Sequence, residues 1–593
     1  MPSPSSRAFR HAALRWLATA EAWGAIASAA IAVPALLAFN APPSATFINQ
    51  AAAFAGWSAL LFALIPSLTG SCLARAGGES ALLGALALVA LAALGSAVFD
   101  GLPAALTASS FATILAAGFT AHMGARCSRA GIGLRVFRAM CVGLVVAGVL
   151  SLVVALVQVF LPDWADGRLI AATSADGRAS GNLRQPNHLS SLLLWSVIGL
   201  LWLHETGRLS RGVTAVVAAF FTFAIVLTAS RTGVAGTVLL AVWGTLDRRL
   251  SRSTRTLLLL APVAYAVFWS GFTAWSHLTH QALGAEARIA DTAESPNSRI
   301  RIWANALTLI AQHPWLGVGF GEFNFAWSLH PFPQRPTAFF DHTHDLPLQL
   351  LVELGVPLGL LVLGLLGYAL WRAFVASRAA DARDASMLRA AFMIVLMIGI
   401  HSLLEYPLWY AYFLLPAAFA WGLCLGGAPA KAPAPASARV PRRATALAGA
   451  ALLMLALSIY SVFDYMRVAA IFSADDPAPL AKRIADGERS WFFAHHAHYA
   501  AATISEHPAQ VLPSFRIATH YLLDTRLMIA WANALHESGD DERARYVAAR
   551  LREFRNEDSK TFFEPCDEPH AAGEPVPFQC TAPTGRFDYR DFR

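Results

Sequence analysis

Apolar segments of membrane-spanning length recur along this chain from Trp23 almost to residue 462. Crossing roughly 30 Å of hydrocarbon takes about 20 helical residues. Only 14% of the 593 residues are charged, whereas a soluble protein carries about 25%. The sequence therefore predicts an all-α, polytopic membrane protein.

Hydropathy places about thirteen spans in this chain, about twelve or thirteen of which we expect to cross the bilayer. The predicted spans are residues 22–40, 51–69, 79–99, 104–124, 139–161, 187–204, 212–229, 232–247, 256–274, 346–371, 388–405, 408–426 and 444–462. Arg7, Arg10 and Arg15 precede the first span, and another span follows it, so we expect an uncleaved first helix.

From the fourth span onward, every second connection is rich in arginine, and such connections face the cytoplasm. This rule places the other connections outside the membrane. They are the loop 162–186, the turn 230–233, the long loop 275–345, the turn 405–407 and everything from residue 463. The basic residues behind the net charge of +7 lie in short loops, so the charge reflects topology and we expect no nucleic-acid partner.

The chain is predicted to divide into a transmembrane domain, 1–462, which includes the outer loop 275–345, and a helical periplasmic domain, 463–593. Within the second domain one segment resembles a tetratricopeptide helix–turn–helix with Gly539 at the turn, but a single copy does not predict a repeat array. Cys566 and Cys580 could close a short loop in an oxidising compartment, and the sequence leaves this open.

A helix is predicted inside the long outer loop, from Asn297 or Ser298 to about Gln312. Its stripe of apolar residues suits a helix lying in the membrane interface. The stripe consists of Ile300, Trp303, Leu307 and Ile310.

The segment FDHTHD (340–345) brings polar side chains to the mouth of a span. His342, His344 and Asp345 do not follow the order of a zinc-binding signature, and no second ligand cluster accompanies them, so no metal is predicted. A histidine is suited to general-base catalysis near neutral pH. The alternative is a histidine that ends a span at the water interface. Glu353, inside the following span, should face a polar interior, as half of an ion pair or as support for the histidine.

Two other outer segments carry possible donors to an anion. GNLRQPNHL (181–189) opens a span with Pro186 in its first turn, so helix amides point outward. Ordinary helix capping is the alternative. Arginines in outer connections could together bind a diphosphate through their forked donors, or be solvated loop charges. The candidate donors are Arg184, Gln185, Asn187, His188, Arg231, Arg288, Arg299 and Arg301.

The segment HSLLEYPLWYAYF (401–413) places Glu405, Tyr406 and several other aromatic residues at an outer turn. An interfacial aromatic belt explains this pattern. The functional alternative is a platform for sugar rings, with a hydrogen bond from Tyr406.

These motifs together resemble the Wzy_C superfamily of O-antigen ligases, polymerases and protein O-oligosaccharyltransferases. The resemblance spans about 180–425, and QPNHL and EYPLWY are most similar to the PglL-type branch. It implies a GT-C-like glycosyltransferase fold without a cofactor. His344 would occupy the family's essential histidine position, and Gln185 and Tyr406 would match further functional positions. Arg231 would contact a lipid diphosphate. The family usually has His-Asn where this chain has His344-Asp345.

The function implied is transfer of a preassembled glycan from undecaprenyl diphosphate to Ser or Thr of a periplasmic protein. The enzyme would lie in the bacterial inner membrane, among lipids, with its active site facing the periplasm. Ligation to lipid A–core and polymerisation of repeat units remain alternatives within the family. A lipid-linked glycan flippase is the alternative that is not an enzyme, but it would need ionisable groups along a path through the bilayer.

Overall fold

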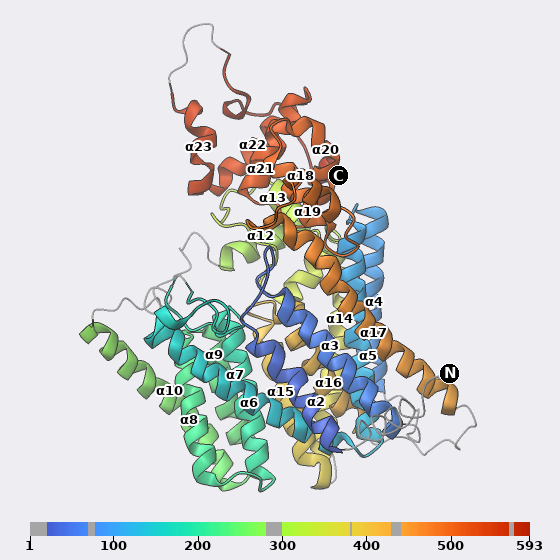
Figure 1. The fold of residues 1–593 in the computed structure, drawn as a ribbon, viewed down its shortest axis with the longest axis vertical. Coiled ribbons are helices and arrows are strands. Elements are labelled where there is room, and N and C mark those ends of the chain that lie inside the picture. The colour runs from blue at the N-terminus through green and yellow to red at the C-terminus, as the bar shows by residue number, and fades with distance from the viewer. Residues whose placement is uncertain are drawn as a thin grey trace. The chain divides into compact units, whose positions relative to one another are not determined.

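The computed structural model describes residues 20–68, 77–174, 176–279, 299–379, 382–427, 440–568 and 575–593, and every regular element in them is helical (Figure 1). A helix occupies each of the thirteen predicted spans. These helices are α2 (Ala20–Leu36), α3 (Phe47–Leu64), α4 (Gly77–Phe99), α5 (Ala104–Arg129), α6 (Gly133–Phe160), α7 (Pro186–Glu205), α8 (Arg211–Leu227), α9 (Arg231–Leu246), α10 (Arg252–Thr279), α14 (Leu346–Ala379), α15 (Ala382–His401), α16 (Ala411–Gly426) and α17 (Val440–Ala469).

Nine helices in the described residues are long and apolar enough to cross a membrane, judged by length and composition. α2, α8 and α16 are apolar but shorter, at 16 or 17 residues. The predicted fold class, an all-α polytopic membrane protein, is confirmed.

The chain forms two compact units. The bundle unit comprises residues 1–84, 116–290 and 365–462, and the tail unit comprises 85–115, 291–364 and 463–593. The predicted domain boundary at 462 coincides with one of these divisions. The tail unit also takes in most of the described outer loop and the ends of α4 and α5.

Close helix contacts built on small residues hold the bundle unit together. α7 is buried from Asn187 to Leu203, because other helices surround it. The Ser196 hydroxyl donates to the carbonyl of Leu144 on α6 at 2.6 Å, and a Cβ at Gly148 would lie 2.6 Å from that hydroxyl oxygen. Small residues that admit such close approach, together with interhelical hydrogen bonds, stabilise helix packing where lipid removes the usual hydrophobic drive.

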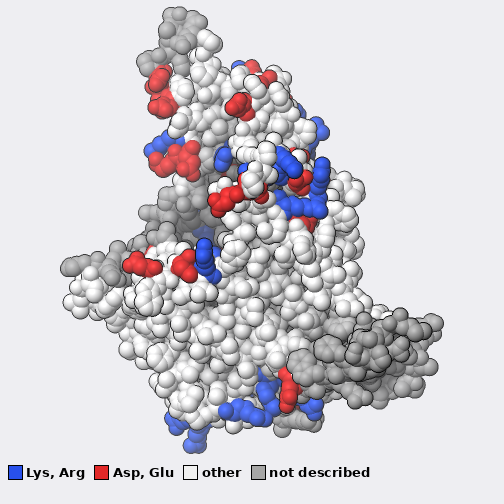
Figure 2. Space-filling view, viewed as in Figure 1, with Lys and Arg blue, Asp and Glu red and all other residues white. Residues whose placement is uncertain are grey.

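The two ends of the bundle unit differ in charge. At one end, the Arg389 guanidinium donates to Asp247 at 2.7 Å, and Glu205 accepts from the Ser251 amide at 3.1 Å. Figure 2 shows Lys and Arg gathered at this end below a broad band of uncharged surface. The opposite ends of α7 and α9 carry Asn187 and Ser230. Three of the arginine-rich connections that predict a cytoplasmic face, in their described residues, therefore meet at one end of this unit.

The larger of two apolar cores in the described part of the tail unit contains residues of both the outer loop and the tail. From the loop come α12 (Arg299–Gln312) and α13 (Phe323–Leu329). From the tail come α19 (Ala494–Ile504), α21 (Thr525–Glu537) and α22 (Asp541–Phe554). Trp327 of α13, Leu527 of α21 and Leu551 of α22 are each fully buried in it. Burying an aliphatic side chain is worth about 1.5–3 kcal/mol, so each part stabilises the other.

Two sequence predictions are confirmed in the tail unit. Gly539, with φ of 86°, makes the turn of the helix–turn–helix between α21 and α22. The predicted helix of the outer loop is α12, but its buried face carries Ile302, Ala306 and Leu309. Ile300 and Leu307, from the predicted stripe, are 56% and 58% exposed. Cys566 and Cys580 are bonded to each other.

Candidate active site

The segment that carries His344 is fixed through its neighbour Thr343. The Thr343 amide donates to Gln349 Oε1 at 2.8 Å, and its carbonyl accepts from Trp303 Nε1 at 3.0 Å. Its hydroxyl donates to the Asp345 carbonyl at 2.8 Å. Thr343 is fully buried, so the backbone on either side of it is held in place.

His344 follows in a left-handed conformation, with φ of 57°. Non-glycine residues adopt this conformation at a cost, and it persists only where the surroundings impose it. The imidazole is half-buried and meets the Phe340 ring edge to face, at 5.5 Å between centroids. His344 thus has a fixed backbone and a side chain that solvent can reach.

The acidic neighbours of His344 have different partners. Asp345 Oδ1 accepts the amide of Leu348 at 2.8 Å and so caps the first turn of α14. Burial raises the pKa of the Asp345 carboxyl, and this hydrogen bond opposes the rise. Asp341 Oδ1 lies 2.9 Å from His342 Nδ1. The Asp345 carboxylate therefore caps a helix, whereas the Asp341 carboxylate pairs with a histidine.

Glu353 is connected to the His344 segment through Gln349. Gln349 Nε2 donates to Glu353 Oε1 at 2.9 Å, and both side chains are buried. Glu353 also accepts the backbone amides of Gly321 and Phe323. Because Gln349 in turn holds the Thr343 amide, Glu353 can position the histidine segment without touching a substrate.

A glycine-rich loop and a break in α14 place Glu353. At Gly355 the helix departs from α geometry, with φ of 74° and ψ of 166°. The freed carbonyls of Val352 and Glu353 accept the amides of Val318 and Gly319, at 2.9 and 3.1 Å. A Cβ at Gly317 would lie 2.5 Å from the Glu353 carbonyl oxygen, so this approach requires glycine.

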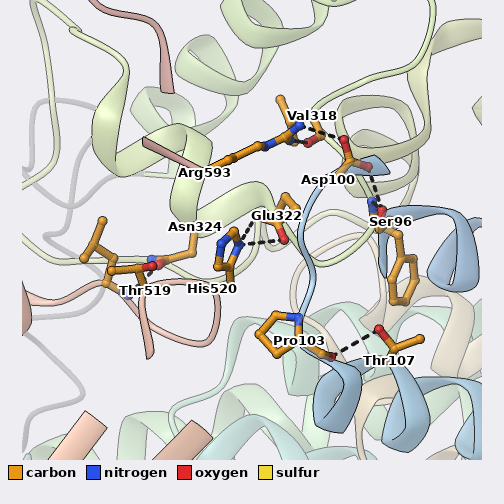
Figure 3. Close-up of polar contacts among 12 residues, drawn as sticks. Ser96, Asp100, Pro103, Thr107, Val318, Glu322, Asn324, Thr519, His520 and Arg593 are labelled. Atoms are coloured by element: carbon orange, nitrogen blue, oxygen red, sulfur yellow. Dashed lines mark hydrogen bonds and ion pairs between the residues drawn. The ribbon is translucent and has the colours of Figure 1, made fainter. Parts of the chain in front are cut away.

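Figure 3 shows further polar contacts of this glycine-rich loop, with residues outside α14. Arg593 donates to Asp100 Oδ1 at 2.8 Å and to the Val318 carbonyl at 2.9 Å. Glu322 lies 2.7 Å from His520 Nδ1, and both are buried. Burial raises the pKa of Glu322, and the hydrogen bond from His520 opposes the rise. No local sequence pattern marks Arg593, Asp100, Glu322 or His520, because each pair joins distant parts of the chain.

A second group of candidate residues lies in the bundle unit, where Asn187 connects three chain segments. Its Nδ2 donates to Glu405 Oε1 at 2.8 Å, and its Oδ1 accepts from the Ser230 hydroxyl at 2.6 Å. The start of α7, the start of α9 and the 405–407 turn therefore meet at one buried amide.

Several of the other candidates in this unit also have structural contacts. Gln185 caps α7 by accepting the His188 amide at 2.9 Å. The His188 ring is buried, 3.1 Å from the Tyr412 hydroxyl and 4.5 Å from the Tyr410 ring centroid. Arg184 donates to the carbonyls of Ala38 and Ala45. These contacts are those of helix capping and packing.

Arg231 and Tyr406 are more accessible. Arg231 is exposed and is the first residue of α9, directly after the cap Ser230. Tyr406 is half-buried, with its ring 6.1 Å from that of Tyr410 in a stacked arrangement. A guanidinium at a helix N-terminus suits an anion.

The remaining candidate arginines belong to the outer loop. Arg299 and Arg301 are half-buried in the first turn of α12, close in sequence to Trp303, which holds Thr343. Arg288 lies outside the described residues. Within the described part of the chain, no group of three or more His, Cys, Asp and Glu side chains is placed to hold a metal ion.

Three family models match this chain. A model described as O-antigen ligase matches residues 215–363, and one described as the C-terminal part of a virulence factor membrane-bound polymerase matches 389–563. A protein glycosylation ligase model matches 179–204. The matched segments contain all of the candidate residues, and the resemblance to the Wzy_C superfamily, close to its PglL-type branch, is confirmed.

Two curated proteins of Acinetobacter baylyi are similar to this chain. A general O-oligosaccharyltransferase is 31% identical over 253 residues, which are 42% of this chain and 43% of that protein. A ComP-specific O-oligosaccharyltransferase is 26% identical over 263 residues, which are 42% of this chain and 44% of that protein. The match thus spans less than half the length of each relative.

Proposed function

Since this chain is a multi-pass membrane protein of the Wzy_C superfamily, close to the PglL-type ligases, we propose that it is a glycosyltransferase that moves a preassembled glycan from a lipid-linked donor to a protein hydroxyl. The observation that carries this proposal is the fixed segment around His344. A reachable imidazole stands on a backbone held by Trp303 and Gln349. Both Acinetobacter relatives are named for O-oligosaccharide transfer.

In the proposed reaction, an imidazole nitrogen of His344 takes the proton from a Ser or Thr hydroxyl. The hydroxyl oxygen then forms a bond to the anomeric carbon of the glycan. The bond from that carbon to the donor phosphate breaks, and its electron pair leaves with the diphosphate. In-line attack inverts the anomeric centre. Positioned general bases contribute about 10²–10⁴-fold to such steps.

The proposed donor is an undecaprenyl diphosphate glycan. Arg231 would neutralise charge that develops on the departing diphosphate, helped by the amides that begin α9. Arg299 and Arg301 would contribute further positive charge, and Gln185 and Tyr406 would orient the donor by hydrogen bonds. A diphosphate is already a good leaving group, so the proposed mechanism requires no metal.

We place the enzyme in the bacterial inner membrane, with these residues facing the periplasm. The arginine-rich connections support this orientation, because they gather at the end of the bundle unit opposite Arg231. The bond between Cys566 and Cys580 also supports it, because disulfides persist in oxidising compartments.

The acceptor is the part of the proposal that most needs a test. Purified protein would be given a lipid-linked glycan and either a pilin-like protein or rough lipopolysaccharide. Glycan on the protein is the expected result. The match of residues 215–363 to O-antigen ligases makes lipid A–core the second candidate acceptor. Glycan on the lipopolysaccharide alone would establish that ligase function and overturn protein glycosylation.

A further inference from the structure

A groove of about 950 Å³ opens in the tail unit, away from the contacts that fix His344. One wall is the loop 337–339. The other walls come from the end of α19, the residues just after it, one face of α21, and the segment 556–558. All of these belong to the tail unit, so the groove is a feature of that unit alone.

One face of α21 lines the groove, and other residues of the same helix fill the core. The lining residues are spaced by three or four positions, which places them on one side of a helix. They are Thr525, Arg526, Ile529, Ala530, Asn533 and Glu537. Leu527 and Trp531 point into the apolar core. The groove therefore has a helical floor that offers polar side chains beside Ile529 and Ala530.

The groove is acidic in a chain whose net charge is +7. Its lining includes four carboxylates, Glu506, Asp524, Glu537 and Asp558, and a single guanidinium, that of Arg526. Glu506 and Asp558 are both exposed. A negative groove attracts a positive partner and disfavours a negative one.

The lining favours a peptide over a sugar. Sugar sites commonly offer an aromatic face, and the aromatic residue that lines this groove is Phe339. Its ring is stacked on Phe554 at 3.8 Å between centroids, so one face is already covered. Asn533 offers both a donor and an acceptor of the kind that pair with a peptide backbone.

One wall of the groove is close in sequence to the candidate active site. Phe339 directly precedes the FDHTHD segment, and His344 lies five residues further along. Five extended residues span at most about 17 Å. A polypeptide bound along the loop 337–339 would thus pass within a few residues' length of the His344 imidazole.

We propose that this groove binds an extended, positively charged segment of the acceptor protein and so presents a nearby Ser or Thr to His344. This inference rests on the proposed function and names the part of the chain that selects its acceptor. Recognition is by charge and by backbone hydrogen bonding, so acceptors of different sequence can share the groove.

The test measures binding of fluorescent peptides to the full-length protein in detergent. One peptide carries a Ser flanked by lysines, and its partner has glutamates in their place. We expect the basic peptide to bind, with an affinity that falls as salt is raised. Glu506→Lys with Asp558→Lys should weaken its binding by about tenfold or more, since both charges are reversed. Glu557→Lys is the matched control, because Glu557 neighbours Asp558 but pairs with Lys560 outside the groove.

Equal binding of the two peptides would overturn the inference. So would a double variant that binds as the control does, or displacement of the peptide by free oligosaccharide, which would show that the groove takes the glycan. The assay needs no lipid-linked donor, so it separates this inference from the proposed function. Wild-type protein that binds the basic peptide but transfers no glycan would overturn the function and leave the groove's charge preference supported.

Discussion

The His344 segment of the tail unit and the Asn187 cluster of the bundle unit hold their polar groups in different ways. In the first, side chains hold the backbone: Gln349 and Trp303 bond to the amide and carbonyl of Thr343. In the second, side chains hold one another, and Asn187 joins Glu405 to Ser230. In the first arrangement solvent can reach the His344 imidazole. In the second, both polar atoms of the Asn187 side chain are hydrogen-bonded to other side chains.

This difference separates residues expected to react from residues expected to support the fold. The His344 side chain is half-buried and that of Arg231 is exposed, so a substrate can reach both. Asn187, Glu405 and His188 are buried, and their loss should be felt in stability. Substitutions of the first kind of residue should therefore lower activity, and substitutions of the second kind should lower stability.

The largest expected effect is that of His344→Ala. Transfer should fall by about 10²–10⁴-fold, because the proposed base is gone, while the protein still accumulates in the membrane. Glycan transfer to the acceptor protein, scored against the amount of enzyme, measures this. His536→Ala, at an exposed histidine of the same unit that pairs with Asp541 and does not line the groove, is the control and should be fully active. Normal transfer by the His344 variant would remove the imidazole from the mechanism.

Gln349→Ala should lower kcat by about tenfold with little change in KM for either substrate, because the Thr343 amide loses its acceptor and His344 is less well positioned. Glu353→Gln keeps an acceptor for Gln349 and should be milder. Steady-state kinetics with both substrates distinguishes the two variants. An increase in KM alone would instead make Gln349 a binding residue.

Arg231→Lys should weaken transfer by several-fold, up to about tenfold, since a point charge cannot reproduce the two-pronged contact of a guanidinium with phosphate. The loss should lie in the use of the lipid-linked donor, with thermal stability unchanged. Arg208→Lys, in an arginine-rich connection, is a matched control. An unchanged rate would make Arg231 an ordinary surface charge.

Asn187→Ala should change activity least per folded molecule and stability most. Glu405 and Ser230 would lose a buried partner, at about 1–3 kcal/mol for an unsatisfied group. The melting temperature in detergent should drop, and activity corrected for folded protein should stay within about twofold. A large loss of kcat without a loss of stability would mean that the two regions do not differ as described.

Hydropathy predicts most of this fold, because a span is a local property of about 20 residues. It correctly located thirteen helices, and the cap and turn residues located α12 and the hairpin at Gly539. It did not reveal the break at Gly355, although Gly355 and Pro357 are the residue types that interrupt a helix. The contacts of Glu353 with the amides of Gly321 and Phe323 depend on tertiary packing that no local pattern encodes.

The sequence predicted which residues form the candidate site, but it did not predict the residues that they contact. The reason is visible at Asn187, whose two partners lie far along the chain, and at Glu322, which meets His520. Polarity in an apolar context marked Asn187, Glu353 and Glu405 as unusual. It could not tell a group that meets a substrate from one that meets another part of the protein.

The shared core of the tail unit has a consequence for how the enzyme is made. A ribosome completes α13 and the His344 segment long before it reaches α21 and α22, which supply much of the apolar surface that α13 packs against. Until those later helices have been made, Trp327 lacks much of the apolar surface that it packs against, and the His344 segment lacks the support of that core. Newly inserted chains should therefore gain activity only after α21 and α22 have been made.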